Sequence, residues 1–196
     1  MLYRIIRITG LVIFSLLGLK RQGMDNLPRQ GPAIVVANHI SNWDPLILGF
    51  ALPRPLCYMA KAELFSMPVL GRLLPMVYAF PVKRGTVDRQ AIKTALENVK
   101  MGRILGIFPE GTRNLKDGPI EIKPGAALIA LRAGCPVIPA ACIGTRGVLP
   151  CGWFRTLKIV LGKPVEISGL SGKSHSSDME ELSRRIEKEI NSLLQK

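Results

Sequence analysis

The sequence predicts a single α/β domain with a central mixed, largely parallel sheet flanked by helices, plus an N-terminal membrane-associating helix. Its 196 residues, 47% of them hydrophobic, suit one domain with a well-formed core. Short apolar runs alternate with segments of helical spacing, which is the pattern of strand–helix–strand units. We therefore expect residues 1–24 to be a basic and apolar membrane-anchoring segment, and residues 25–196 to be the domain.

The segment 8–19 is uncharged and mostly apolar, and basic residues flank it on both sides. A helix of this length would measure about 18 Å, whereas the hydrocarbon core of a bilayer is about 30 Å thick. No small-x-small cleavage site of a signal peptide follows the segment. We expect the helix to lie in one leaflet or in the interface, with Arg4, Arg7, Lys20 and Arg21 on lipid headgroups. The alternative is that the helix packs on the domain itself.

The rest of the chain divides into strands and helices at proline, glycine and polar breaks. Strands are expected at residues 33–38, 55–61, 77–84, 103–108, 136–144 and 157–167. Helices are expected at residues 45–52, 62–75 (broken at Pro68 and stopped by Pro75), 87–101, 124–133 and 178–195. A polar, glycine-bearing link at residues 168–178 precedes the last helix.

Local signals support several of these boundaries. Asp44 is expected as the N-cap and Pro45 as the first residue of a helix. Apolar residues recur at helical spacing along residues 87–101. The last helix is expected to open at Ser177, with Glu180 three residues later as in a capping box.

A formal net charge of +13 draws the chain toward anionic partners, which include nucleic acid, anionic lipid and phosphorylated substrates. Charge alone does not choose among them. Aromatic residues make up only 6% of the chain, and no nucleic-acid-reading motif is present. We therefore expect no nucleic-acid partner, and we favour a membrane surface with anionic lipids.

The four cysteines form no C-x-x-C pair, and the two histidines do not cluster with them. This pattern predicts no metal site, and a domain of this size needs no disulfide framework. Small buried thiols in a reducing cytosol are the expected state.

A histidine and an aspartate stand five positions apart where the first expected strand ends, in "NHISNWDP". A carboxylate bonded to Nδ1 of an imidazole leaves Nε2 free to accept a proton and stabilises the imidazolium that forms. His39 and Asp44 are therefore a candidate base and its orienting partner. The alternative is that Asp44 only caps the helix and that His39 is a polar turn residue.

Further chemistry-bearing residues follow other expected strands, where ligands of α/β sheets gather. The loop "PEGTR" offers backbone amides, a hydroxyl, a carboxylate and Arg113, whose guanidinium suits a phosphate. Glu110 could hold Arg113, the turn or a substrate hydroxyl, and an ion pair within the loop is the alternative. Lys61 and the pair Lys83–Arg84 close two other strands, where ordinary surface charge is the alternative. The apolar stretch 63–76 suits a lipid channel, a membrane contact or the core.

Together these segments resemble the glycerolipid acyltransferase family, and within it the bacterial-type 1-acylglycerol-3-phosphate acyltransferases. Four blocks of that family are matched in order between residues 30 and 165, and they read "NHISNWD", "KAELFSMPVLGRLLPMVYAFPVKR", "FPEGTR" and "PVIPAACIGT". Three departures stand out. The second block tends to end in an aliphatic residue, any residue and arginine, and "PVKR" is close to this pattern but not identical. The family usually has a glycine near the position of Val77, and the N-terminal segment is shorter than a two-helix membrane anchor.

The resemblance implies an O-acyltransferase that moves a fatty acyl group from a thioester to the free hydroxyl of 1-acylglycerol 3-phosphate, giving phosphatidic acid. It implies His39 as general base and Asp44 as its partner. It places the acceptor phosphate on a set of six residues, which are Lys61, Arg84, Glu110, Gly111, Thr112 and Arg113. Acyl-CoA or acyl carrier protein would carry the donor acyl group, and no cofactor or metal is implied. The expected location is peripheral or monotopic on the cytoplasmic face of the cell membrane.

Several alternatives remain open at this level. The same chemistry could serve another acceptor, such as glycerol 3-phosphate or a lyso-amino-acid lipid. Ser41 could form an acyl-enzyme, or the chain could be a non-catalytic protein that binds anionic lipid. A hydrolase of the G-x-S-x-G type is not expected, because that motif is absent.

Overall fold

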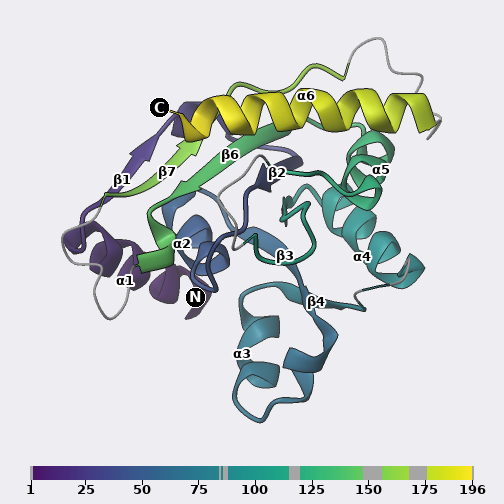
Figure 1. Ribbon diagram of the computed structural model, residues 1–196. Coiled ribbons are helices and arrows are strands. Elements are labelled where there is room, and N and C mark those ends of the chain that lie inside the picture. The colour runs from purple at the N-terminus through teal and green to yellow at the C-terminus, as the bar shows by residue number, and fades with distance from the viewer. Residues whose placement is uncertain are drawn as a thin grey trace.

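A mixed β-sheet forms the centre of the fold in a computed structural model that describes residues 2–83, 85, 88–114, 120–147, 156–167 and 176–195 (Figure 1). Within those residues the sheet has seven strands in the order β1-β7-β6-β2-β5-β3-β4. The strands are β1 (Leu19–Gln22), β2 (Ala33–Ala37), β3 (Leu56–Lys61), β4 (Ala79–Val82), β5 (Ile104–Ile107), β6 (Val137–Ile143) and β7 (Leu157–Leu161).

Five neighbouring strands of this sheet, β6, β2, β5, β3 and β4, run parallel to one another. Strand β7 is antiparallel to β6, and β1 runs parallel to β7 at the edge. The predicted mixed, largely parallel sheet is therefore confirmed. The carboxyl ends of the five parallel strands meet at one edge of the sheet, which is where α/β proteins place their ligands.

Helices cover both faces of the sheet (Figure 1). They are α1 (Leu2–Leu16), α2 (Asp44–Ala51), α3 (Leu70–Met76), α4 (Arg89–Lys100), α5 (Pro124–Ala133) and α6 (Ser176–Leu194). Short 3₁₀ helices are η1 (Met24–Asn26), η2 (Ala62–Ser66) and η3 (Thr145–Gly147). Side chains of α1, α2 and α3 pack on one face, and side chains of α4, α5 and α6 pack on the other.

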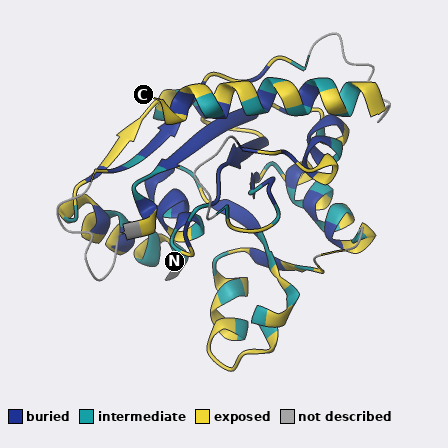
Figure 2. Ribbon diagram, viewed as in Figure 1, coloured by how far each residue is buried: buried dark blue, intermediate teal, exposed yellow. Residues whose placement is uncertain are grey.

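The central strand β2 is apolar at every position because helices cover both of its faces. Ala33, Val35 and Ala37 face the core shared with α1 and α2, whereas Ile34 and Val36 face the core shared with α4, α5 and α6. All five residues are fully buried, as the dark blue of this strand shows (Figure 2). A parallel strand covered on both faces must be apolar at every position rather than at alternate ones.

The N-terminal segment differs from the expected layout. The helix runs over Leu2–Leu16 rather than residues 8–19, and Gly18, with a φ of 88°, then turns the chain into β1. Strand β1 was not predicted, because only Leu19 of its four residues is buried and the others are polar and exposed. The sheet thus extends across the boundary that was expected between residues 24 and 25.

Two of the basic residues that were expected on lipid headgroups instead contact the end of α2. Arg7 donates from Nη1 to the carbonyl of Leu52 at 2.5 Å, and Arg21 donates to the carbonyl of Ala51 at 3.1 Å. Both guanidinium groups thereby neutralise the negative end of the α2 dipole. In the described part of the chain no helix combines the length and the apolar character needed to cross a bilayer.

Other boundaries lie close to the predicted ones. The expected strand 77–84 is shortened to β4, and Tyr78 before it adopts a φ of 58°, a conformation that favours glycine. The last helix begins at Ser176, one residue before the expected start. Cys57, Cys135 and Cys142 are free and buried, as predicted, while Cys151 lies outside the described residues.

Candidate active site

The candidate site lies where β2, β5 and β6 end side by side at the carboxyl edge of the sheet. The segment after β2 carries His39, the segment after β5 carries Glu110, and the segment after β6 forms η3. Residues far apart in the sequence therefore meet here because parallel neighbours end at the same edge.

His39 and Asp44 form the buried pair that the spacing predicted. Nδ1 of His39 lies 3.0 Å from Oδ2 of Asp44, and the two residues are 8% and 0% exposed. A carboxylate can only accept here, so the imidazole proton is assigned to Nδ1 and Nε2 is left with a free lone pair. The His39 ring also stacks on Phe108, with ring centroids 4.4 Å apart.

Asp44 does not cap its own helix, contrary to expectation. It is the first residue of α2 rather than the N-cap, and Trp43 occupies the cap position. Oδ2 of Asp44 turns back instead and accepts the backbone amides of Ile40 and Ser41, each at 2.7 Å. The carboxylate thus closes the turn that carries His39 at the same time as it holds the imidazole.

The loop after β5 hydrogen-bonds both the backbone N–H and the backbone carbonyl of His39. Its N–H donates to Oε2 of Glu110 at 2.8 Å, and its carbonyl accepts the amide of Asn114 at 2.7 Å. Burial raises the pKa of the Glu110 carboxyl, while hydrogen bonds from the His39 amide and the Asn114 side chain oppose that rise. Glu110 therefore holds the backbone of His39, and it also lines the cavity described below.

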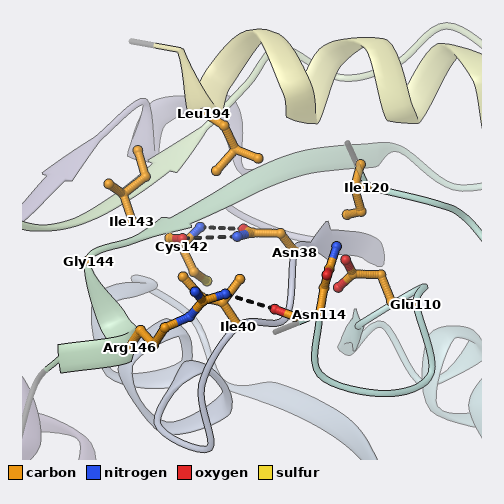
Figure 3. Close-up of a pocket in the computed structure, with 10 residues that line it drawn as sticks. All are labelled: Asn38, Ile40, Glu110, Asn114, Ile120, Cys142, Ile143, Gly144, Arg146 and Leu194. Atoms are coloured by element: carbon orange, nitrogen blue, oxygen red, sulfur yellow. Dashed lines mark hydrogen bonds between the residues drawn. The ribbon is translucent and has the colours of Figure 1, made fainter. Parts of the chain in front are cut away.

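Asn38 ties the same turn to the strand on the other side. Its side-chain amide donates to the carbonyl of Cys142 at 3.0 Å and accepts the amide of Cys142 at 2.7 Å, as the paired dashed lines show (Figure 3). The turn after β2 is thereby braced to β6 as well as to the β5 loop.

Of the other residues predicted to bind the phosphate, only some lie on the same loop as Glu110. Gly111 has a φ of 69°, which a side chain would strain, and the Lys123 side chain lies directly over it. Thr112 and Arg113 are exposed on the same loop. Lys61 ends β3, one strand beyond β5, and its ammonium lies 3.3 Å from Glu63. Arg84 lies outside the described residues.

The sequence reasoning missed Arg146, which follows β6 in η3. Arg146 donates from Nη2 to the carbonyl of Asn114 at 3.1 Å, so it reaches across the end of β2 from β6 to the β5 loop (Figure 3). It also lines a cavity of about 380 Å³ together with Asn38, Ile40, Glu110 and Asn114. A signal was available, because Arg146 is basic and follows a strand as Lys61 and Arg113 do.

Ser41, the alternative nucleophile, is buried and already bonded. It is 8% exposed, and its Oγ accepts the amide of Trp43 at 3.2 Å. Among the described residues no cluster of three or more histidine, cysteine or acidic side chains is arranged to hold a metal ion.

A buried carboxylate that holds Nδ1 of an imidazole leaves Nε2 able to accept a proton, which is the arrangement that general-base catalysis requires. The family model described as Acyltransferase matches residues 18–143. This span contains His39, Asp44 and the loop after β5. The chain belongs to the acyltransferase family, and it is an acyltransferase.

Named relatives support the same assignment. A 1-acyl-sn-glycerol-3-phosphate acyltransferase of Bacillus subtilis is 36% identical over 189 residues, which cover 93% of this chain and 94% of that protein. One from Streptococcus pneumoniae is 33% identical over 86% of this chain and 63% of its own length. The crystal structure of the 1-acyl-sn-glycerophosphate acyltransferase PlsC from Thermotoga maritima matches with a TM-score of 0.72 and 30% identity. That match covers 97% of this chain and 80% of the solved one.

Proposed function

We propose that the protein transfers a fatty acyl group from a thioester donor to the free hydroxyl of 1-acylglycerol 3-phosphate, giving phosphatidic acid. The observation that carries the proposal is the buried contact between Nδ1 of His39 and Asp44. The relatives named above as 1-acyl-sn-glycerol-3-phosphate acyltransferases support lysophosphatidate as the acceptor class.

In the proposed reaction Nε2 of His39 removes the proton of the acceptor hydroxyl as its oxygen attacks the thioester carbonyl. The tetrahedral intermediate collapses, the carbon–sulfur bond breaks, and the imidazolium returns its proton to the departing thiolate. Asp44 stabilises the imidazolium between these steps. General-base help of this kind contributes about 10²–10⁴-fold to the rate.

The acceptor phosphate must lie near the base, because it is carried on the glycerol carbon next to the reacting hydroxyl. Arg113, Gly111 and Thr112 share the loop that holds His39 through Glu110, so they are the nearest of the proposed phosphate residues. Lys61 ends β3, which lies farther from β2 in the sheet order, and we assign it to the outer part of the phosphate site. Arg84 remains a proposed phosphate residue on the resemblance alone.

The test is an acyl-transfer assay with purified protein and labelled donors of both kinds, acyl-CoA and acyl carrier protein. Lysophosphatidate is expected to be acylated in preference to glycerol 3-phosphate and to a lyso-amino-acid lipid. A clear preference for one of the other acceptors would contradict the assignment, and failure to acylate any of them would contradict the reaction.

Direct transfer also predicts that no acyl-enzyme forms. Ser41→Ala should stay within about tenfold of wild-type turnover, because losing one hydroxyl bond is worth roughly 0.5–1.5 kcal/mol. Intact-protein mass spectrometry after mixing with donor alone should show no added acyl group. A hydroxylamine-sensitive acyl-protein that disappears in Ser41→Ala would establish the serine route instead.

We further propose that the protein is peripheral or monotopic on the cytoplasmic face of the membrane and contacts lipid through α1. The exposed side of α1 is mostly apolar, although Arg4, Thr9 and Ser15 are also exposed. Its exposed large apolar residues are Ile5, Ile8, Val12, Ile13 and Leu16. Replacing Ile8, Val12 and Leu16 together by serine should move the protein from the membrane to the soluble fraction. Unchanged membrane association in high salt would contradict the role of α1.

A further inference from the structure

Among the residues that the structure describes, the exposed apolar side chains are concentrated on one side of the sheet. Of the fourteen large apolar side chains that are exposed among the described residues, twelve belong to α1, α2 or residues 67–78. Only Met101 and Leu194 lie elsewhere. The helices of the opposite face, α4 and α6, present charged residues to solvent. Exposed apolar surface this concentrated marks an interaction site in soluble proteins.

Residues 67–78 make the second part of this surface. Their exposed apolar members are Met67, Val69, Leu70, Leu73, Met76 and Tyr78. The only charged residue in the stretch is Arg72, which is also exposed. The surface therefore continues well beyond α1, which the proposed function already assigns to the membrane.

Folding does not account for these outward-facing residues. Phe65, Leu74 and Val77 of the same region point inward and pack against the core under α1 and α2. Gly71 lets α3 pack tightly on η2, because a side chain there would collide with the carbonyl of Phe65. The segment is thus a compact unit with its own buried side, and its second apolar side remains exposed.

The charges around the segment suit an anionic lipid surface. Arg72 lies within it and Lys83 follows it, both exposed, while Lys61, which pairs with Glu63, precedes it. The neighbouring ends of β3 and β4 bring both lysines to the carboxyl edge of the sheet. Basic side chains beside an apolar surface are the usual arrangement of interfacial membrane proteins. The lysines would lie at the level of the lipid headgroups, and the apolar residues below them.

The segment is also physically joined to α1. The rings of Tyr3 and Tyr78 lie 5.1 Å apart between centroids, which brings the start of α1 next to the end of α3. Arg103 lies 5.5 Å above the Tyr78 ring and helps to hold it. In Figure 1, α3 projects from the body of the protein beyond β4.

We propose that residues 67–78 form a second lipid-contacting element, which works with α1 to hold the catalytic edge of the sheet against the bilayer. The partner is the interface of a membrane that contains anionic phospholipid, and the long-chain acceptor leaves that interface beside α3. This proposal depends on the proposed function in one respect, which is that the acceptor is a membrane lipid.

A fluorescent label at two matched positions tests the contact directly. Val69 is 68% exposed in the segment, and Met101 is 66% exposed after α4. Val69→Cys and Met101→Cys are each labelled with an environment-sensitive dye in a Cys151→Ser background of the full chain. Cys57, Cys135 and Cys142 are buried, and burial raises the pKa of the first two thiols to about 11 and the pKa of Cys142 well above its ordinary value, so all three should label far more slowly than an exposed cysteine.

Vesicles of phosphatidylglycerol and phosphatidylcholine should shift and strengthen the emission of the label at position 69 and leave the label at 101 unchanged. Equal responses at both positions, or none at either, would overturn the proposal. A response at position 69 without vesicles, together with a dimer on gel filtration, would assign the surface to a second copy of the chain and would also overturn it.

An activity test separates this contact from the chemistry. The triple variant Val69→Ser/Leu73→Ser/Met76→Ser should lose about tenfold or more in kcat/KM on long-chain lysophosphatidate in vesicles, because it removes apolar area from the contact. It should stay within about twofold of wild type on a short-chain acceptor that is monomeric in water. Equal activity of variant and wild type on vesicles would overturn the proposal. If the wild-type protein acylates neither acceptor, the proposed function is contradicted instead. The fluorescence experiment then still tests the lipid contact on its own.

Discussion

Asp44 shows how one carboxylate can serve both the fold and the chemistry. Its Oδ2 receives two backbone amides of the turn and the Nδ1 of His39, and the residue has no exposed surface. The sequence posed helix capping and base orientation as alternatives. In the structure the carboxylate caps the turn that precedes the helix, and this places it beside the imidazole.

The substitution Asp44→Asn should separate these two roles. An amide oxygen still accepts the turn amides, but it cannot stabilise an imidazolium as a charge does. We expect turnover to fall by about 10²–10⁴-fold, while the thermal midpoint drops by only a few degrees. Steady-state assays and thermal unfolding measure the two effects. A loss of stability large enough to unfold the protein, or near-normal turnover, would contradict the assignment.

Glu110 yields a prediction with a defined pH dependence. Burial raises the pKa of its carboxyl, so the ionised form costs stability once the pH exceeds that raised value. The stabilising effect of the protonated Glu110 carboxyl is complete below the unfolded pKa of about 4.3. It is lost as the pH rises through the folded pKa. Glu110→Gln, which is neutral throughout, should therefore gain stability relative to wild type between pH 4 and pH 8. Denaturant unfolding across that range measures the difference, and the opposite trend would contradict it.

The same substitution should slow the reaction. A neutral amide oxygen accepts the His39 amide less strongly than a carboxylate does, and the difference is about 1 kcal/mol. We expect kcat to fall roughly fivefold with little change in KM for the acceptor. A rise in KM alone would return Glu110 to the substrate-binding role that the sequence first gave it.

At the scale of single residues, the sequence predicted a contact between neighbours along the chain but not the hydrogen bonds to distant residues. The pattern of histidine and aspartate predicted the contact between His39 and Asp44, because that contact spans only five positions. The bond from the His39 amide to Glu110 joins residues 71 positions apart, and the pairing of Asn38 with Cys142 spans 104. No local pattern indicates such contacts, so Asn114 and Arg146 were not identified.

Among the elements, the three strand-end segments around β2 act as one unit. Asn38 ties the turn after β2 to β6, Glu110 ties it to the loop after β5, and Arg146 reaches from β6 to that loop. The turn that carries His39 is therefore held from both neighbouring strands. Such support is what keeps a catalytic group within a fraction of an ångström of its working position.

The contact of Arg146 across β2 predicts a specific kinetic effect. Arg146→Met removes the hydrogen bond to Asn114, whose amide holds the His39 carbonyl. We expect kcat to fall about three- to tenfold with KM nearly unchanged, which corresponds to one hydrogen bond of this type. Arg146→Lys should recover part of the loss. Arg184→Met, which removes an exposed arginine that pairs with Glu181 on α6, is the control. A rise in KM at constant kcat would show that Arg146 binds substrate instead.

Element boundaries followed the sequence where apolar pattern and caps agreed. Strand β2 was recognised because it is apolar on both faces, and α4 because its apolar residues recur at helical spacing. Strand β1 was missed because Lys20, Arg21 and Gln22 are exposed at the edge of the sheet, where a polar strand resembles a loop. Its partner strand, β7, lies almost 140 positions away along the chain.

At the scale of the whole molecule, the two faces of the sheet differ in chemistry. One face is covered by α1, α2 and α3, which expose apolar residues, and the other by helices with charged outer surfaces. The catalytic edge lies between them, and α2 of the apolar side begins at Asp44 itself. The mixed sheet and the acyltransferase family were both predictable from the sequence. This asymmetry was not, because it depends on which helices share a face.

The central claim is that His39 acts as the general base for acyl transfer to the acceptor hydroxyl. The most direct measurement is the turnover of His39→Ala with lysophosphatidate and a saturating acyl thioester, alongside its thermal midpoint and its binding to vesicles. The account predicts a fall of about 10²–10⁴-fold in kcat with folding and membrane binding preserved. Turnover within tenfold of wild type, in a variant that is equally folded and equally membrane-bound, would contradict it.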